Sequence, residues 1–181
     1  MYDLSLHILD LIENSIRAKA TAIAVSVEAD PDADELTILV EDNGAGLSVP
    51  ASQASDPFYT TKQGKRTGLG LSLLRGAAER AGGKLSLGPS ALGGLAVTAT
   101  MGLSHIDRSP MGDLAATVSS VVCTNPEIDL MCRLQVGDRQ YEVCARDVVQ
   151  EVPAGAQQGL ALARRVSEKI KTGLAALSLS G

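Results

Sequence analysis

The sequence predicts an α/β fold in which helices pack on one sheet, and the order of its periodic segments is the main observation. Over residues 1–103 that order is helix, strand, strand, loop, helix, strand, strand, which is typical of a sandwich of helices against a sheet. The composition agrees, because 181 residues with 45% hydrophobic and 20% charged side chains can bury a core without disulfides or metals. Residues 104–181 add a shorter series of helix, strand, strand and helix. We therefore predict one domain over 1–103 and a small α+β appendage over 104–181.

The first element is a helix over residues 2–19, with too many apolar side chains to be half exposed. Its polar residues recur at intervals of three and four, which places them on one stripe. A polar stripe on a buried helix must face a partner, so we expect a ligand or another element there. The stripe consists of His7, Asp10, Glu13, Asn14 and Arg17.

Two strands rich in Val and Ile follow over residues 22–29 and 35–41, separated by a turn at Asp30-Pro31-Asp32. The second strand ends in the loop Asp42-Asn43-Gly44-Ala45-Gly46. Residues 47–66 hold few apolar side chains and two prolines, which favours a mobile segment over a packed element.

A second helix is predicted from about Gly68 to Ala81, because Thr67 precedes it and Gly82-Gly83 is a helix stop. Strands near residues 84–87 and 95–101 complete this part of the chain.

The region after residue 104 has its own local signals. Ser109-Pro110 has the form of an N-cap followed by proline at the first helical position, and this helix should end before Asn125-Pro126. A hairpin about Gly137-Asp138 and an amphipathic helix over residues 160–177 follow. A two-residue hairpin loop would pair Cys132 with Val143 and turn the two thiols to opposite faces, whereas a three-residue loop would place Cys132 opposite Cys144.

Composition excludes several classes of function. The net charge of -5, the 2% of aromatic residues and the absence of Trp disfavour binding to nucleic acid. The sequence has neither an apolar run long enough to cross a bilayer nor a signal peptide, so we expect no membrane partner and a cytoplasmic location. Cysteines at 123, 132 and 144 are odd in number and form no CxxC pair, which argues against a disulfide framework and a zinc site.

Three elements together point to a nucleotide triphosphate. The loop at 42–46 offers a carboxylate that can accept from an amino group and glycines that let a ligand lie against backbone. The glycines at 68–70 open a helix, whose first amides bind phosphate. Asn14 adds a neutral oxygen suited to Mg²⁺.

These segments resemble the motifs of the GHKL or Bergerat-fold ATPases, which include histidine kinase catalytic domains, DNA gyrase B, mismatch-repair ATPases and mitochondrial protein kinases. Histidine-kinase-like domains resemble the chain most closely. The resemblance implies a two-layer sandwich of helices on a mixed sheet. It rests on Leu11–Ala18 as the N box, Glu41–Leu47 as the G1 box, Asp56–Lys62 as the F box and Thr67–Ser72 as the G2 box.

The resemblance also implies roles for individual residues. Asn14 would hold Mg²⁺ against the triphosphate of ATP, and Asp42 would receive the adenine amino group. Amides at the start of the second helix would hold phosphates beneath a lid formed by residues 47–66. The nucleotide-binding positions are Asn14, Asp42, Gly44, Gly46, Lys62, Thr67, Gly68, Leu69, Gly70 and Leu71.

Asp10 lies one helical turn before Asn14, where ATP-hydrolysing members of this family carry a glutamate as general base. Aspartate is one methylene shorter, which reduces its reach. Glu13 is the rival base, but its position on the helix turns it away from the ligand. Leu95 stands near a position where the family usually has a threonine beside the adenine.

Two functions follow from the resemblance. The first is a stand-alone kinase that passes the γ-phosphoryl group of ATP to a partner protein in signalling or regulation, as the short lid and residues 58–61 favour. The alternative is an ATP-operated binding switch with little turnover, favoured by Asp10 and by the lack of a phospho-acceptor hairpin ahead of the N box. A third, less favoured hypothesis is an interaction domain that binds no nucleotide. The C-terminal segment would pack on the core, form a homodimer through its last helix or bind the partner, and the sequence does not choose among these.

Overall fold

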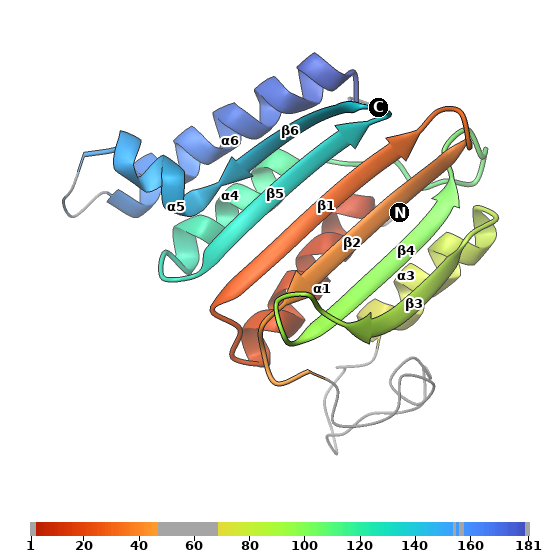
Figure 1. The fold of residues 1–181 in the computed structure, drawn as a ribbon, viewed down its shortest axis with the longest axis horizontal. Coiled ribbons are helices and arrows are strands. Elements are labelled where there is room, and N and C mark those ends of the chain that lie inside the picture. The colour runs from red at the N-terminus through yellow and green to blue at the C-terminus, as the bar shows by residue number, and fades with distance from the viewer. Residues whose placement is uncertain (1–2, 47–68, 154, 156–157, 180–181) are drawn as a thin grey trace.

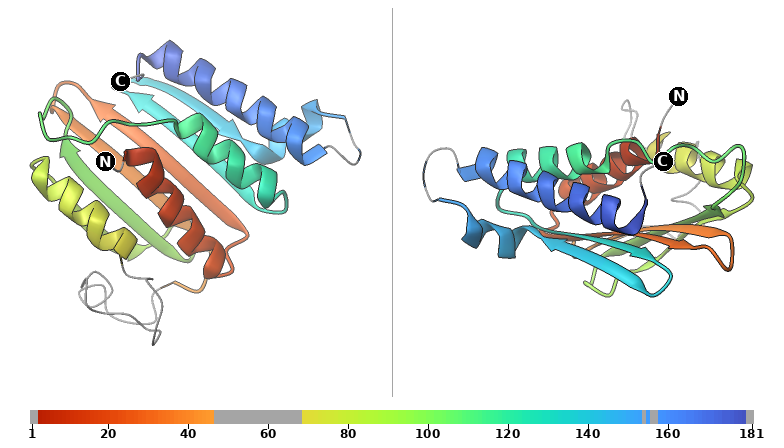
Figure 2. Two further views of the ribbon diagram at one scale, coloured as in Figure 1. Left: turned by 180° about the vertical axis from the view of Figure 1, so that it is seen from behind. Right: turned by 90° about the horizontal axis from the view of Figure 1, so that it is seen from above.

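The protein has two layers, a twisted sheet and a set of helices on one of its faces (Figures 1 and 2). The computed structural model describes residues 3–46, 69–153, 155 and 158–179. Within these residues no helix covers the opposite face of the sheet (Figure 2). No helix of this described part is long and apolar enough to cross a membrane.

The sheet of the described residues is mixed, with strand order β3-β4-β2-β1-β5-β6. β1 pairs with β5 in parallel, while each other neighbouring pair is antiparallel. This arrangement, with helices on one face, confirms the predicted α/β fold. The strands are β1 (Ala22–Asp30), β2 (Glu35–Asp42), β3 (Lys84–Pro89), β4 (Leu95–Gly102), β5 (Asp129–Val136) and β6 (Arg139–Cys144).

Two helices cover the half of the sheet that carries the predicted site. α1 (Leu4–Arg17) begins at Asp3, whose side chain accepts from the backbone N–H of Leu6 at 3.0 Å. Its apolar face, which includes Leu4, Ile8 and Ile12, is fully buried. α3 (Leu69–Arg80) lies beside α1 and ends at the predicted glycine pair.

The C-terminal part continues the same sheet, because β5 adds to β1 and β6 to β5. The predicted order of helix, strand, strand and helix is present as α4 (Leu114–Thr124), β5, β6 and α6 (Gln158–Leu177), with α5 (Ala145–Val148) and the 3-10 helix η1 (Val149–Glu151) between the last two. Side chains from both parts of the chain form one apolar core. The boundary at residue 104 stays a prediction.

The predicted start of α4 is wrong. The helix begins at Leu114 and is capped by Asp113, whose carboxylate accepts from the N–H of Ala116 at 2.8 Å. Pro110 lies outside the helix because its carbonyl accepts from the N–H of Leu4 at 2.9 Å. The N-cap signal at Ser109-Pro110 is therefore overridden by this hydrogen bond to the start of α1.

The hairpin has the two-residue loop, since Cys132 pairs with Val143 and Met131 with Cys144. The two thiols therefore point to opposite faces of the sheet. Cys132 is buried, and burial raises the pKa of its thiol to about 12. This cysteine is part of the core.

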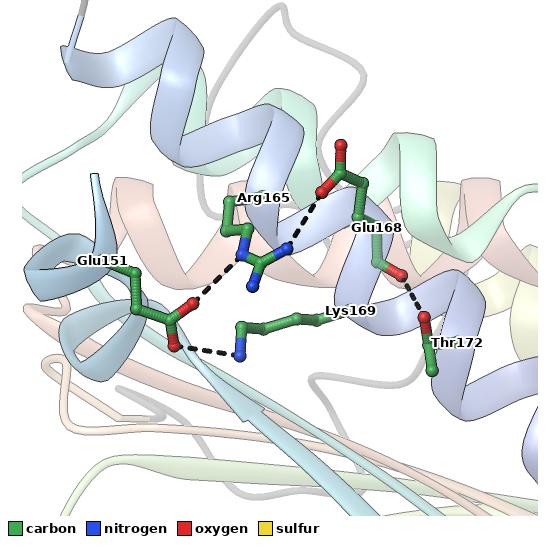
Figure 3. A network of polar contacts seen from close by, with 5 residues as sticks. All are labelled: Glu151, Arg165, Glu168, Lys169 and Thr172. Atoms are coloured by element: carbon green, nitrogen blue, oxygen red, sulfur yellow. Dashed lines mark hydrogen bonds and ion pairs between the residues drawn. The ribbon is translucent and has the colours of Figure 1, made fainter. Parts of the chain in front are cut away.

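An exposed network of charges ties η1 to α6 (Figure 3). Glu151 accepts from Lys169 at 2.9 Å and from Arg165 at 3.0 Å. Arg165 also pairs with Glu168 at 3.2 Å. The network links the 3-10 helix that follows α5 to the C-terminal helix.

Candidate nucleotide-binding site

A cavity of about 180 Å³ lies where α1 and α3 meet β2 and β4. Its lining is mostly apolar, with Asp42, Asn14 and Ser15 as its polar side chains. Pockets for whole small-molecule ligands run to roughly 300–1,000 Å³, so this one suits a single flat group such as a base. Its lining residues are Leu11, Asn14, Ser15, Ala18, Val40, Asp42, Gly46, Leu71, Leu95 and Val97.

The carboxylate of Asp42 is held in place by three donors at the end of β2. Its Oδ1 accepts from the backbone N–H of Gly44 at 2.9 Å and from that of Leu95 at 3.2 Å. Its Oδ2 accepts from the hydroxyl of Ser15 at 2.6 Å. Each carboxylate oxygen can accept two hydrogen bonds, so Oδ2 retains capacity for a donor from a ligand. With 4% of Asp42 exposed, that donor must enter through the cavity.

Glycines let the backbone close around this carboxylate. A Cβ at Gly94 would collide with Oδ1 and the carbonyl of Asp42. A Cβ at Gly44 would lie 2.8 Å from the carbonyl oxygen of Ala18 at the end of α1. Gly46 has a φ of 67° and lines the cavity. A side chain at Gly94 would push the start of β4 away from Asp42, and one at Gly44 would push the loop after β2 away from the end of α1.

Asp10 lies against the first turn of α3. A Cβ built on Gly70 would stand 3.3 Å from the Cβ of Asp10 and 3.4 Å from its Oδ2. The first N–H groups of a helix have no acceptor within it and attract anions. A phosphate held at the start of α3 would therefore lie close to the Asp10 carboxylate.

Asn14 lines the cavity one turn after Asp10, and its Oδ1 accepts from the Arg17 guanidinium at 2.7 Å. An amide oxygen carries two lone pairs, and neutral oxygen is a ligand type that Mg²⁺ accepts. Asn14 could thus supply one oxygen to a magnesium ion whose other ligands are phosphates and waters, although Arg17 competes for the same atom. The described residues contain no cluster of three or more His, Cys, Asp or Glu side chains for a metal.

The structure brings many of the predicted site residues together. Asn14, Asp42, Gly46 and Leu71 line one cavity, with Gly44 beside Asp42 and Asp10 beside Gly70. Glu13 is exposed, which agrees with the prediction that it turns away. Leu69 begins α3, while Lys62, Thr67 and Gly68 lie outside the described residues.

Two residues of this site were missed by sequence reasoning. Ser15 supplies the hydroxyl on Asp42, and the backbone N–H of Gly94 donates to the Asp42 carbonyl at 2.9 Å. Leu95 contributes its N–H in place of a side chain. No spacing in the sequence pointed to Ser15, because its contact with Asp42 depends on how α1 packs against the end of β2.

Comparison with known proteins agrees with this geometry. Residues 3–105 match the family described as histidine kinase-, DNA gyrase B-, and HSP90-like ATPase. The chain belongs to this family. The predicted GHKL resemblance and the Bergerat type of fold are thereby confirmed, and the chain is an ATP-binding, histidine-kinase-like module.

Several characterised proteins are similar to this family member. The C4-dicarboxylate transport sensor protein DctS of Rhodobacter capsulatus is 35% identical over 99 residues, which cover 52% of this chain and 15% of that protein. The sensor protein DctB of Pseudomonas aeruginosa is 36% identical over 93 residues, covering 49% and 15%. This chain thus spans only a small part of these relatives. The MutL ATPase domain of Aquifex aeolicus, solved with ADP, aligns with a TM-score of 0.47 at 12% identity, covering 91% of this chain and 70% of that structure.

Proposed function

We propose that this GHKL module binds ATP with Mg²⁺ and transfers the γ-phosphoryl group to a side chain of a partner protein in a regulatory pathway. The observation that carries the proposal is the packing of Asp10 against Gly70. It puts a carboxylate beside the helix start that would hold phosphate, as a general base requires.

The cavity would take the adenine. The exocyclic amine of the base donates to Oδ2 of Asp42, next to the Ser15 hydroxyl that already donates there. The triphosphate then runs toward the first amides of α3, which complement its negative charge. Asn14, between these two points on α1, would hold Mg²⁺, which neutralises part of the triphosphate charge.

In the transfer step, the nucleophilic atom of the partner's side chain bonds to the γ-phosphorus as the bond from that phosphorus to the bridging oxygen breaks. ADP leaves with the electron pair of that bond. A hydroxyl acceptor passes its proton to the Asp10 carboxylate, directly or through one water. Positioning and charge stabilisation supply most of the catalysis in such reactions.

A switch that binds ATP with little turnover is the second candidate. Two observations favour it: Asp10 has a shorter side chain than the glutamate expected in hydrolysing members, and Arg17 occupies the Asn14 oxygen at 2.7 Å. In a switch, nucleotide binding would change a partner surface without phosphoryl transfer.

Substitution of Asp10 separates the two. For a kinase, Asp10→Asn should lower phosphate release and γ-phosphate transfer to lysate proteins by roughly a hundredfold, the usual scale for a positioned base. ATP affinity, measured by calorimetry, should change little. Asp10→Glu should retain or raise the native rate. Glu13→Gln is the matched control, because that exposed carboxylate lies on the same helix.

A native rate at background that Asp10→Asn leaves unchanged would favour the switch. A large loss of turnover in Glu13→Gln would show that the wrong carboxylate has been assigned as the base.

A further inference from the structure

A second and larger hollow, of about 520 Å³, lies on the helix side near the start of α1. It is bounded by α1, the outer face of α3 and the segment that connects β4 to α4, which passes the ends of both helices (Figure 2). We call it the α1–α3 groove. The side chains that matter for its chemistry are His7, Leu73, Arg80, Ile106, Asp107 and Arg108.

Apolar side chains in the groove are open to water. Ile106 is 94% exposed and Leu73 is 42% exposed. Both belong to the few large hydrophobic residues that the described part of the chain leaves exposed. Exposed apolar groups that gather in a concave site mark surfaces that bind other molecules.

The segment that presents Ile106 is braced on both sides. The Asp34 carboxylate accepts from the N–H of Ser104 at 2.9 Å and from its hydroxyl at 2.8 Å. Arg108 Nε donates to the carbonyl of Leu103 at 2.7 Å, which closes the turn beneath Ile106. A backbone segment that such hydrogen bonds already hold loses little conformational entropy on binding.

The groove is also more basic than the chain as a whole, whose net charge is -5. Neither Arg80 nor Arg108 forms an ion pair with a described residue, and Asp107 is the acidic side chain in the lining. Burial lowers the pKa of His7 below its ordinary value, although Asp10 and Asp3 oppose this effect and Arg80 adds to it. Arg80 is exposed, whereas Arg108 already donates through Nε and Nη1 to the carbonyls of Leu103 and Ser109 and keeps only its remaining N–H groups for a ligand. Arg80 and these remaining donors, beside an exposed isoleucine, complement a segment that carries both carboxylate and aliphatic side chains.

We propose that the α1–α3 groove docks a segment of the partner protein in which an aliphatic side chain stands next to one or more carboxylates. The partner class rests on the proposed function, since a kinase or a switch of this kind needs a protein to act on. His7 lies one helical turn before Asp10, so a segment bound in the groove approaches the site along α1. A hollow between two helices suits a peptide segment better than a flat lipid surface, and the negative net charge opposes an anionic membrane.

A random peptide library displayed on phage and selected on the full chain without nucleotide tests the proposal. We expect the selected sequences to combine Asp or Glu with Leu, Ile or Val. Fluorescence anisotropy with one such peptide should show about tenfold weaker binding for Ile106→Ser and for Arg80→Glu, the scale of a buried anchor residue. Arg80→Glu should also flatten the salt dependence of binding.

Matched controls lie on α6, away from the groove. Leu160→Ser changes an exposed leucine (49% exposed) and Lys171→Glu reverses an exposed charge, and both should bind the peptide as the native chain does. ATP titration of each variant should match the native chain. Because peptide binding is measured without nucleotide, a loss of peptide binding and a loss of phosphoryl transfer are separate results.

Several results would overturn the proposal. One is a selection that yields no binder or yields peptides without acidic residues. Another is native binding by both groove variants. Binding of phosphatidylserine vesicles that depends on Ile106 and Arg80 would assign the groove to a membrane, and self-association lost in Ile106→Ser would assign it to a second copy of the chain.

Discussion

The substitution Asp42→Asn tests how the site selects adenine, because the surroundings dictate which way the new amide must lie. Two backbone N–H groups, from Gly44 and Leu95, point at the Oδ1 position and require an acceptor there. The amide oxygen therefore takes that position and the amide nitrogen replaces Oδ2. Ser15 then accepts from this nitrogen instead of donating to Oδ2, because a hydroxyl can do either. The fold keeps its hydrogen bonds while the atom facing the cavity changes from acceptor to donor.

The effect on nucleotide binding can be worked out from this exchange. Adenine presents an amino donor at the position where guanine presents a carbonyl acceptor. ATP loses a hydrogen bond to a charged acceptor, worth about 1.5–3 kcal/mol, which corresponds to roughly ten- to a hundredfold weaker binding. GTP gains a donor where it met a repelling oxygen, so its affinity should rise.

Calorimetric titration with ATP and GTP measures both changes. Glu41→Gln is the matched control, because it neutralises the preceding carboxylate, which accepts from the N–H of Ala91 at 3.1 Å and does not line the cavity. The control should keep the native affinities. A folded Asp42→Asn protein with an unchanged preference for ATP over GTP would refute the assignment of this cavity to the base.

Three further predictions concern the same fold. Asn14→Ala should weaken binding of ATP with Mg²⁺ much more than binding without metal, and equal losses in the two titrations would remove Asn14 as the magnesium ligand. Ser15→Ala should lower the free energy of unfolding by about 1.5–3 kcal/mol and the melting temperature by roughly 3–12 °C, whereas Ser119→Ala, which removes a half-buried hydroxyl whose exposed hydrogen bond goes to its own helix, should change neither by a comparable amount. Hydrogen bonds from Lys169 and Arg165 lower the pKa of Glu151 below its ordinary value of 4.5, so its contribution to stability is present above that pH and is lost as the pH falls through the lowered pKa. Glu151→Gln should therefore melt earlier than the native chain at neutral pH, and thermal unfolding should show this gap closing in acid; a gap that widened in acid would contradict the role of the network.

The sequence predicted well those features that depend on residues close together in the chain, such as helix positions, helix ends and motifs. Hydrophobic spacing identified α1, and Gly82-Gly83 marked the end of α3 within a residue or two. The motifs also indicated the family and brought Asp10, Asn14 and Asp42 into one hypothesis. Local periodicity and backbone chemistry carry this information, because both act over a few residues.

What the sequence missed depends on contacts between distant segments. The contact of Ser15 with Asp42 requires the α1 face to meet the end of β2, and no spacing rule gives that distance. Pro110 looked like a helix start, but its carbonyl pairs with α1 and the helix begins later. The pairing of β5 with β1 could not be predicted either, since the hairpin signal gives β6 as the neighbour of β5 and no other.

The parallel pairing of β1 with β5 has a consequence for how the chain is made. β1 can pair with β2 as soon as both are synthesised, because a short turn joins them. The other edge of β1 pairs with β5, which lies much later in the chain: the first residue pair of that ladder is Ala22 with Asp129. Contacts between residues so far apart raise the contact order and slow folding. Until the ribosome has released β5, the nascent protein presents an open strand edge of the kind that templates aggregation. A fragment that stops at residue 103 would keep this edge open, so we expect it to self-associate more readily than the whole chain does.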